Sequence, residues 1–509
     1  MSRAIGIDLG TTYSAAAFLD EYGKPSVIKN SEGRSTTPSV IFVDEPQFVV
    51  GEVALQSTVN DPERVVQFVK RFMGQSDHRL HVDGQSYSPE FLSSIILRKL
   101  VQEAELSLGE TVSDAVITVP AYFTESQRNA TLEAGKLAGL NVLRIISEPT
   151  AAALAYGLQN RDDEGARNIL VYDLGGGTFD VTVIETSAEA LRVLAVGGDP
   201  FLGGKDFDDR ILNWIEEKLK AVGEEIIFDT ALEAELRLKA EVAKVQLSAR
   251  TSAPIAFKAR KKHPLSALDA LLPVRLELSR QEFETLCADL LARTEMLLEN
   301  VLAQAGLDLV DIDEVLCVGG SSRMPMVREM LLRATARRPQ LFDPDECVAK
   351  GAAIQAGLLA NNPALGGMKV GHVLAHSLGV ATNQNGDIVI DHVVPALTPL
   401  PHTQVRRGYT TVKDNQASVN VLIYEGESSE AEAYDAPVGR IALDTAPLRA
   451  AGEPQIAVEF RCDENGRITV FARDEATGRE GRALLCLSSE RSDEEISLEH
   501  ELFARAVVV

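Results

Sequence analysis

The 509-residue chain is poor in cysteine, in aromatic residues and in positive charge. Its five cysteines are odd in number, widely spaced and never arranged as Cys-X-X-Cys, which argues against a disulfide framework or a zinc site and fits a reducing compartment. Lys and Arg number 50 against 75 Asp and Glu, so the formal net charge is -25. Because this charge repels polyanions, we expect neither nucleic acid nor membrane surfaces as partners.

Long apolar runs and targeting segments are also missing. No stretch reaches the roughly 18 consecutive apolar residues that suggest a membrane span. The first residues, MSRAIGIDLG, run directly into a strand pattern without the features of a secretion signal. The sequence therefore predicts a cytoplasmic location, and its length predicts several structural units rather than one core.

Strand patterns alternate with helical patterns from residue 4 to about 360, which is typical of α/β domains. One helix is predicted inside TESQRNATLEAGKLAGL, because Thr124 and Gln127 have capping-box spacing and Gly139 provides a stop. After NNPALGGMKVGH, 361–372, the long helical patterns give way to short alternating runs separated by turn dipeptides. A domain boundary is predicted there.

The region that follows reads as an all-β module. In QIAVEFRCDENGRITVFARD, apolar and polar residues alternate on both sides of Asn465 and Gly466, which predicts an antiparallel hairpin. The end of the chain, SSERSDEEISLEHELFARAVVV, has Ser492 and Glu495 in capping-box spacing and room for one short helix. Its AVVV ending is expected either to dock on the β module or to mark a truncated form.

Two glycine turns share one pattern, in AIGIDLGTTYSAAAF, 4–18, and VYDLGGGTFDVTV, 171–183. In each, an apolar strand ends in an aspartate, glycines let backbone N–H groups approach an anion, and threonine hydroxyls add donors. Such loops can bind phosphate, and Asp8 and Asp173 facing each other across a cleft could bind a hydrated Mg²⁺. The alternative is that the glycines only make hairpin turns, but two matched copies favour the phosphate-binding interpretation.

A third glycine motif, VLCVGGSSRMP at 315–325, follows an apolar strand and precedes a helix. The diglycine allows close approach of a flat ring or a phosphate, and Arg323 could stack on a base. Together with these motifs, the chain carries others in a fixed order: FVKRFMG, VITVPAYFTESQR, ISEPTAAALAYG, FLGGKDFD and DPDECVAKGAAIQAG. Over about residues 3–488 it resembles the heat shock protein 70 (Hsp70) family of DnaK-like chaperones, in a short form without the C-terminal helical lid.

The resemblance implies an α/β actin-like (ribonuclease H-like) two-lobed ATPase domain over 1–365, a linker over 366–376 and a β-sandwich peptide-binding domain over 377–488. A short helical tail without a lid would occupy 489–509. It also implies ATP or ADP with Mg²⁺ as cofactors, and a chaperone of protein folding and the stress response as the function. Expected partners are unfolded or extended polypeptides, a J-domain co-chaperone and a nucleotide exchange factor.

The resemblance also assigns residues, by matching motif, to catalysis. Lys70 would lie by the γ-phosphate, where a cation offsets charge during in-line attack by water; without the resemblance it reads as a surface lysine. Glu148 and Asp173 would orient the water or the metal, and Asp180 is a further possible metal carboxylate. The expected catalytic set is Lys70, Glu148, Asp173, Asp8 and Thr178.

Further residues are implied to bind the nucleotide and to relay its state. The expected nucleotide-binding residues are Gly10, Thr11, Thr12, Tyr13, Gly175, Gly176, Gly177, Glu241, Lys244, Ser248, Gly319, Gly320, Arg323 and Asp345. Pro120 and Arg128 match positions that relay nucleotide state to the second domain, and Arg144 matches a position that meets the J-domain. The expected peptide-binding residues are Val380, Tyr409, Val412, Val419 and Val421.

Two departures from the family pattern bear on coupling and specificity. The linker has Gly371 and His372 where apolar and acidic residues are expected, which predicts weaker interdomain coupling. Asn383 stands where an apolar residue usually arches over the peptide, which predicts altered peptide binding. An ATP-dependent chaperone-like protein is the favoured hypothesis; the rivals are a sugar-kinase-type phosphotransferase, a filament-forming actin relative and an ATP-binding scaffold without peptide work.

Overall fold

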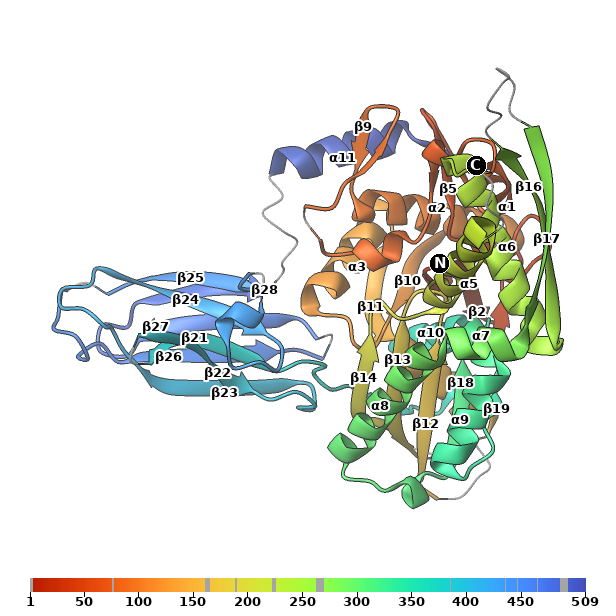
Figure 1. The fold of residues 1–509 in the computed structure, drawn as a ribbon. Coiled ribbons are helices and arrows are strands. Elements are labelled where there is room, and N and C mark those ends of the chain that lie inside the picture. Colours follow the sequence, from red (N-terminus) through yellow and green to blue (C-terminus); the bar gives the residue numbers. More distant parts are fainter. Residues whose placement is uncertain are drawn as a thin grey trace.

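In the computed structural model, the α/β part of the chain and an all-β unit lie side by side, and the last helix returns to the α/β part (Figure 1). None of the described helices is long and apolar enough to cross a membrane. The residues that the structure describes are 3–75, 77–160, 165–187, 190–221, 226–261, 270–384, 386–434, 436–445, 447–464, 466–485 and 493–509.

Two six-stranded sheets repeat one topology. The first has the order β11-β10-β1-β2-β3, with β4 pairing β2, and the second has the order β19-β18-β12-β13-β14-β20. In each, a central strand forms an antiparallel hairpin on one side and pairs with a parallel strand on the other. The first sheet consists of β1 (Arg3–Asp8), β2 (Tyr13–Leu19), β3 (Pro25–Val27), β4 (Thr37–Pro38), β10 (Val112–Val119) and β11 (Asn141–Ser147). The second consists of β12 (Arg167–Leu174), β13 (Phe179–Thr186), β14 (Ala190–Asp199), β18 (Glu314–Val318), β19 (Gln340–Leu341) and β20 (Lys369–Gly371).

Helices cover both sheets and hold them together. The predicted capping box of α3 is confirmed: Thr124 Oγ1 accepts from Gln127 N, and Gly139 follows the helix with φ +86°. The helices beside the first sheet are α2 (Pro89–Leu108), α3 (Glu125–Leu137) and α10 (Cys347–Leu359), while α4 (Glu148–Gln159) lies between the sheets, against α10 and against β12 and β13 of the second. The helices beside the second are α5 (Gly204–Ala221), α6 (Thr230–Ala249), α7 (Arg280–Leu286), α8 (Ala288–Ala305) and α9 (Pro325–Thr335).

Smaller sheets and 3-10 turns complete the α/β part. One sheet has the order β15-β16-β17, another β29-β6-β5-β7, and β8 pairs with β9. Their members are β5 (Ile41–Asp44), β6 (Gln47–Val50), β7 (Val65–Val66), β8 (Leu80–Val82), β9 (Gln85–Tyr87), β15 (Ile226–Ile227), β16 (Ser252–Lys261), β17 (Ala270–Ser279) and β29 (Val507–Val508). The short helices are α1 (Glu52–Ser57), η1 (Pro62–Arg64), η2 (Val69–Phe72), η3 (Leu309–Asp311), η4 (Gly320–Arg323) and η5 (Pro363–Leu365).

The all-β unit is a pair of four-stranded antiparallel sheets, β22-β21-β24-β25 and β23-β26-β27-β28, around one apolar core. The alternation predicted around residue 466 is confirmed, since its inward residues are buried; Asn465 itself lies outside the described residues. These inward residues are Ile456, Val458, Phe460, Ile468, Val470 and Ala472. The strands are β21 (Leu378–Gln384), β22 (Asp387–Val394), β23 (His402–Tyr409), β24 (Ser418–Glu425), β25 (Gly439–Asp444), β26 (Ile456–Cys462), β27 (Ile468–Asp474) and β28 (Glu480–Leu485), with η6 (Ala431–Ala433) between β24 and β25.

The end of the chain corrects one expectation. Helix α11 (Asp493–Arg505) is present, although Ser492 of the expected capping box lies outside the described residues. The AVVV ending does not dock on the β sandwich, because β29 instead pairs in parallel with β6 of the α/β part. An open strand edge offers unpaired N–H and C=O groups to any extended segment, and β6 provides such an edge.

The thiols behave as expected from their spacing. Cys287, Cys317, Cys347 and Cys462 are free and buried, and Cys486 lies outside the described residues. Burial raises the pKa of the Cys287 and Cys317 thiols to about 12, so both stay protonated and unreactive at neutral pH.

Helix α10 packs so closely against its neighbours that two glycines are required. A Cβ on Gly351 would lie 1.7 Å from Ala151 O of α4, and one on Gly6 would lie 2.0 Å from Ala353 N. Both clashes involve backbone atoms, which cannot move aside without shifting a helix or a strand. The contact between α4, α10 and β1 therefore depends on having glycine, without a side chain, at positions 351 and 6.

We predict that Gly351→Ala lowers the free energy of unfolding of the α/β part by about 3 kcal/mol or more, at or above the upper end of overpacking costs. Gly157→Ala, in α4, is the matched control, because its nearest neighbour would be Thr186 Oγ1 at 3.6 Å. That variant should stay within about 1 kcal/mol of wild type. Urea unfolding of the two variants measures the change in the free energy of unfolding. Equal changes in both would contradict the proposed packing.

Candidate nucleotide site

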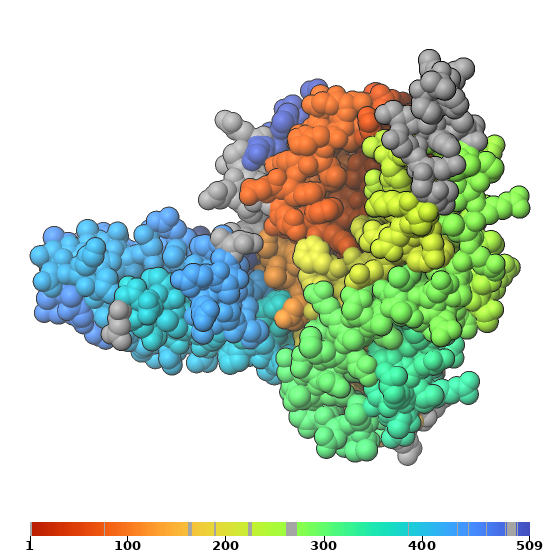
Figure 2. Space-filling model, in the orientation of Figure 1, coloured from red at the N-terminus to blue at the C-terminus, as the bar shows by residue number. Residues whose placement is uncertain are grey.

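A cavity of about 440 Å³ lies between the two six-stranded sheets, within the range of about 300–1,000 Å³ typical of ligand pockets. The space-filling view shows a hollow between the orange N-terminal segments and the yellow-green residues of α6 (Figure 2). Side chains from both sheets, from η2 and from α6 line it. A ligand here would therefore contact both halves of the α/β part.

The two predicted phosphate loops meet at the bottom of this cavity. A Cβ on Gly176 would lie 2.1 Å from Thr12 Oγ1, and one on Gly177 would lie 2.3 Å from Thr11 Cγ2. Glycine is therefore required for the loops to touch. The loop residues that line the cavity are Gly10, Thr11, Thr12, Tyr13, Gly175, Gly176 and Thr178; Gly177 lies behind them.

A buried ion pair occupies the centre of the charged end. Lys70 Nζ, from η2, donates to Glu148 Oε1, from the first residue of α4, and only 4% of Lys70 is exposed. Asp8, at the end of β1, accepts from Thr118 Oγ1 at 3.2 Å. The interpretation of Lys70 as a surface lysine is therefore wrong. Lys70, Glu148, Asp8 and Asp173 all line the cavity.

The carboxylates around this ion pair outnumber its one ammonium group, that of Lys70, so their negative charge is not balanced. Burial, and then the charge of Glu148, raise the pKa of Asp8 and of Asp180 to about 7, while Lys70 opposes both shifts. The pKa of Asp173 is also raised well above its ordinary value, first by burial and then by Glu148. A cation at this position would relieve the repulsion between the carboxylates.

These residues fit a hydrated magnesium ion better than a directly coordinated one. Among the described residues, no three His, Cys, Asp or Glu side chains lie close enough together to hold a metal directly. Asp180 Oδ1 accepts from Tyr122 N at 3.1 Å, but its buried Oδ2 has no hydrogen-bond partner in the described structure. Since Mg²⁺ usually keeps several waters and binds one or two carboxylates plus phosphates, the donor set suits it.

The other end of the cavity has the residues expected to contact a nucleoside. Lys244 Nζ donates to Asp208 Oδ2 and to Gly204 O, both at 2.8 Å, which ties α6 to the start of α5. Arg323 Nη2 donates to Asp345 Oδ2 at 2.5 Å near the cavity mouth. The predicted residues that line this end are Glu241, Lys244, Ser248, Gly319, Gly320, Arg323 and Asp345.

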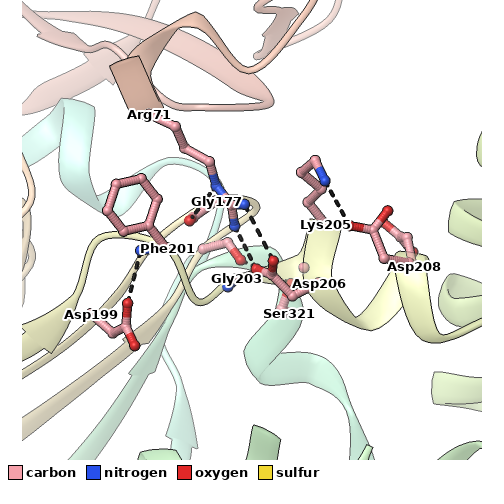
Figure 3. A network of polar contacts seen from close by, with 12 residues as sticks. Arg71, Gly177, Asp199, Phe201, Gly203, Lys205, Asp206, Asp208 and Ser321 are labelled. Carbon is pink, nitrogen blue, oxygen red and sulfur yellow. Dashed lines mark hydrogen bonds and ion pairs between the residues drawn. The ribbon is translucent and has the colours of Figure 1, made fainter. Parts of the chain in front are cut away.

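Sequence reasoning missed a polar bridge between the two halves of the site (Figure 3). Arg71 Nε donates to Gly177 O at 2.8 Å, and Arg71 Nη2 donates to Asp206 Oδ2 at 2.5 Å. The same Oδ2 accepts from Gly203 N at 2.7 Å. Asp206 lies in the FLGGKDFD motif, but no spacing in the sequence joins it to an arginine so far away.

The comparison with protein-family models agrees with this geometry. The model described as Hsp70 protein matches residues 4–502. The chain belongs to the Hsp70 family. Membership supports a chaperone-type ATPase that binds ATP or ADP with Mg²⁺, and it supports polypeptide clients and co-chaperones as partners in general.

In this Hsp70 the linker pairs with the second sheet despite its unusual sequence. Strand β20 pairs in parallel with β14, placing Gly371 opposite Arg192. A Cβ on Gly371 would come no closer than 3.6 Å to another atom, so glycine is not required there. His372 is partly buried with its Nε2 atom shielded from solvent, and this desolvation together with Arg144 and Arg128 lowers its pKa to about 4. A neutral imidazole therefore takes the place of the expected acidic residue.

The expected relay residues lie where the β sandwich meets α3 and β11. Arg128 donates to Ala121 O at 3.2 Å and to Phe123 O at 3.3 Å, and it fixes the turn that follows Pro120. Arg144, the expected J-domain contact, lies 4.0 Å from Glu464 of the sandwich. A partner that binds Arg144 would therefore compete with the docked sandwich.

The expected peptide-binding residues do not form one exposed surface. Val380 and Val421 lie in the sandwich core, and Val419 packs partly buried against it. Tyr409 donates from its hydroxyl to Asp391 Oδ2 at 2.7 Å, whereas Val412 is 61% exposed. Their role in peptide binding stays a prediction.

A pair of carboxyl groups, Glu425 buried and Glu125 partly buried, lies in the same interface. The backbone N–H of Glu125 donates to both carboxylate oxygens of Glu425 at 3.1 Å. Burial, and then the charge of Glu425, raise the pKa of Glu125 to about 8. Burial is also the main cause that raises the pKa of Glu425 to about 7. Arg128 lowers both pKa values; Glu427 opposes it at Glu425 and Asp463 at Glu125.

We predict that sandwich docking weakens as the pH rises. An exposed glutamate has a pKa of 4.5, so the docked state binds extra protons between that value and about 7 to 8. Docking should weaken most between about pH 6.5 and 8, because at lower pH His372 and His376, whose pKa values are lowered at the same interface, oppose the two glutamates. Fluorescence energy transfer between probes on α2 and on β23 measures it.

Two matched variants distinguish the effect of this glutamate pair on docking from the effect of removing one negative charge anywhere on the sandwich. Glu425→Gln should make docking less dependent on pH, because the amide stays neutral and still accepts from Glu125 N. Glu432→Gln, at an exposed position of the sandwich, should keep the wild-type dependence. Identical pH profiles for the two variants would refute a role for the buried pair.

Proposed function

We propose that this Hsp70 family member hydrolyses ATP slowly in the cavity and couples the nucleotide state to binding and release of extended polypeptide by the β sandwich. One observation carries the proposal. Two matching glycine loops, from duplicated hairpins, meet at a cavity that also contains the buried Lys70 and its surrounding carboxylates. An actin-like, two-lobed ATPase has this arrangement, because each lobe contributes one phosphate loop.

The chain's own residues account for phosphoryl transfer to water. Backbone N–H groups and threonine hydroxyls of the two loops would hold the phosphates, and Thr178 would donate to the transferring group. Lys70 would offset the charge that spreads over the phosphoryl oxygens. Asp173 and Glu148 would orient the attacking water. Mg²⁺, when bound through water to Asp8 and Asp173, with Asp180 as a further possible carboxylate, would neutralise charge on the phosphates.

Coupling to the sandwich would use the linker and α3. Strand β20 extends the second sheet, while Glu125 N and Tyr122 O of the first half contact Glu425 and His376 of the sandwich side. A relative rotation of the two sheets would pull these contacts apart. Polypeptide would bind the sandwich in extended form, through Val380, Tyr409, Val412, Val419 and Val421. A J-domain protein, a nucleotide exchange factor and a cytoplasmic location belong to the same proposal.

A second candidate is an ATP-binding scaffold with weak interdomain allostery. It is favoured by the burial of Val380 and Val421 in the sandwich core, which leaves less apolar surface for a peptide. Nucleotide-dependent peptide affinity separates the two. A labelled, unfolded apolar peptide should bind less tightly with ATP than with ADP, and it should stimulate turnover. Equal affinities and unchanged turnover would favour the scaffold while leaving the ATPase assignment intact.

We predict that Lys70→Ala lowers the single-turnover rate of ATP hydrolysis by about 10²-fold or more, because a preorganised charge is lost from the transition state. Nucleotide binding should persist, since the loops and the base-side residues remain. Lys136→Ala, an exposed lysine of α3, is the control and should hydrolyse ATP like wild type. Stabilisation of the variant by ATP in thermal unfolding checks that it is folded, and an unchanged rate would exclude Lys70 from catalysis.

A further inference from the structure

The last residues of the chain form an edge strand of the α/β part, far in sequence from the strand that they pair with. Val507 N donates to Pro46 O at 2.8 Å, and Val509 N donates to Phe48 O at 3.0 Å. In return, Val50 N donates to Val509 O at 3.0 Å. The parallel register places Val507 opposite Gln47. The edge of β6 is thus occupied by the chain's own ending.

Helix α11 adds side-chain contacts to this backbone pairing. Leu502, Phe503 and Val508 pack, partly buried, against the apolar cluster formed by β1, β5, β6 and α2. The Phe503 ring meets the Phe91 ring of α2 edge-on, with centroids 6.4 Å apart. Arg79 lies 3.5 Å from Glu495 and 3.8 Å from Glu499. Figure 1 shows α11 lying beside β9 and α2, away from the sandwich.

The sheet that accepts the tail also leads to the catalytic lysine. Its order is β29-β6-β5-β7, so the tail lies at one edge and β7 at the other. Only Gln67 and Phe68 separate β7 from η2, which carries Lys70 and Arg71. Phe68 has φ 60°, a left-handed conformation that a bulky residue adopts at a cost. Pairing of the tail with this small sheet should therefore limit the movement of Gln67 and Phe68, the residues that lead to η2.

The tail also limits how far the β sandwich can move. The sandwich leaves the α/β part through β20 and returns to it through α11, so it is joined at both ends. Eight peptide bonds join Leu485, at the end of β28, to Asp493, at the start of α11. Fully extended, this connection spans roughly 28 Å. If Leu485 and Asp493 are to lie farther apart than this, α11 must unwind or the tail must leave β6.

We propose that residues 493–509 are an intramolecular latch, and that the β6 edge with the adjoining face of α2 is its binding site. The ligand class of this site is an extended apolar segment preceded by an amphipathic helix, added in parallel to β6. The chain's own tail is the occupant. Closed, the latch keeps the sandwich near α3 and stabilises the sheet that leads to Lys70. Open, it frees the sandwich and exposes a strand edge.

Val507→Pro tests the latch in the full-length chain. Proline has no N–H to donate to Pro46 O, while the Val507 side chain is 49% exposed and loses little packing. Val507→Ala keeps the N–H and is the matched control. Hydrogen exchange at the Val50 amide, which donates to Val509 O, should become at least tenfold faster in Val507→Pro and stay at the wild-type rate in Val507→Ala. Equal exchange in both variants would overturn the proposal.

A second pair of variants tests the helix and guards against misfolding. Phe503→Ala removes a partly buried ring, whereas Leu498→Ala removes a side chain that is 65% exposed on the same helix. Between probes on β23 and α2, the efficiency of energy transfer should fall and the distribution of distances should broaden in Phe503→Ala and Val507→Pro, but not in Leu498→Ala. Wild-type distances in both would show that the tail does not hold the sandwich, and would overturn the latch.

A synthetic peptide of residues 493–509 tests the binding site directly. It should bind Val507→Pro and restore protection of the Val50 amide, while wild type, with its site occupied, should bind it at least tenfold more weakly. Failure to bind the folded variant would overturn the site. If protection of the Val50 amide in wild type is lost on dilution and sedimentation shows a dimer, the segment on β6 comes from a second copy of the chain. That result would overturn the intramolecular latch. None of these readouts needs ATP, so the latch and the proposed ATPase fail independently.

Discussion

Contact between the two glycine loops is the constraint on which the rest of the structure depends. Gly176 and Gly177 approach the side chains of Thr12 and Thr11 so closely that no Cβ fits between the loops. The two sheets can meet there only because the second hairpin turns on bare glycines, against which the threonine side chains of the first turn pack. The cavity, the bridge from Arg71 to Gly177 O and the position of η2 all follow from this approach.

At the Lys70 end of the cavity, buried carboxylates outnumber the cations. One buried ammonium, Lys70, faces Glu148 and a group of aspartates whose pKa values are raised because burial and repulsion penalise their charged forms. A site of this kind costs stability when empty and gains it when a cation binds. The same rule applies at the interface, where the partly buried Glu125 lies against the buried Glu425. Excess negative charge at these two positions should therefore make nucleotide binding depend on a bound cation and domain docking depend on pH.

The sequence predicted what depends on local pattern and missed what depends on distant pairs. The capping box of α3 and the hairpin around residue 466 follow from spacings of a few residues, and the structure has both. The bridge from Arg71 to Asp206 joins residues 135 positions apart, and although each lies in a motif, no spacing in the sequence indicates that the two motifs pair. The tail was misplaced for a related reason: a run of valines fits any open strand edge, so only the fold decides that the edge is β6.

Attachment at both ends changes what an interdomain signal requires. A domain joined by one linker can swing freely once its contacts break, whereas a domain held also at its far end can only rotate within the span of the second connection. Because β20 extends the second sheet and β29 extends the sheet next to η2, the sandwich joins the two halves that enclose the cavity. If those halves close on a nucleotide, as proposed, closure would strain one attachment or move the sandwich. The geometry itself, rather than the apolar character of the linker, can then carry the coupling that Gly371 and His372 were expected to weaken.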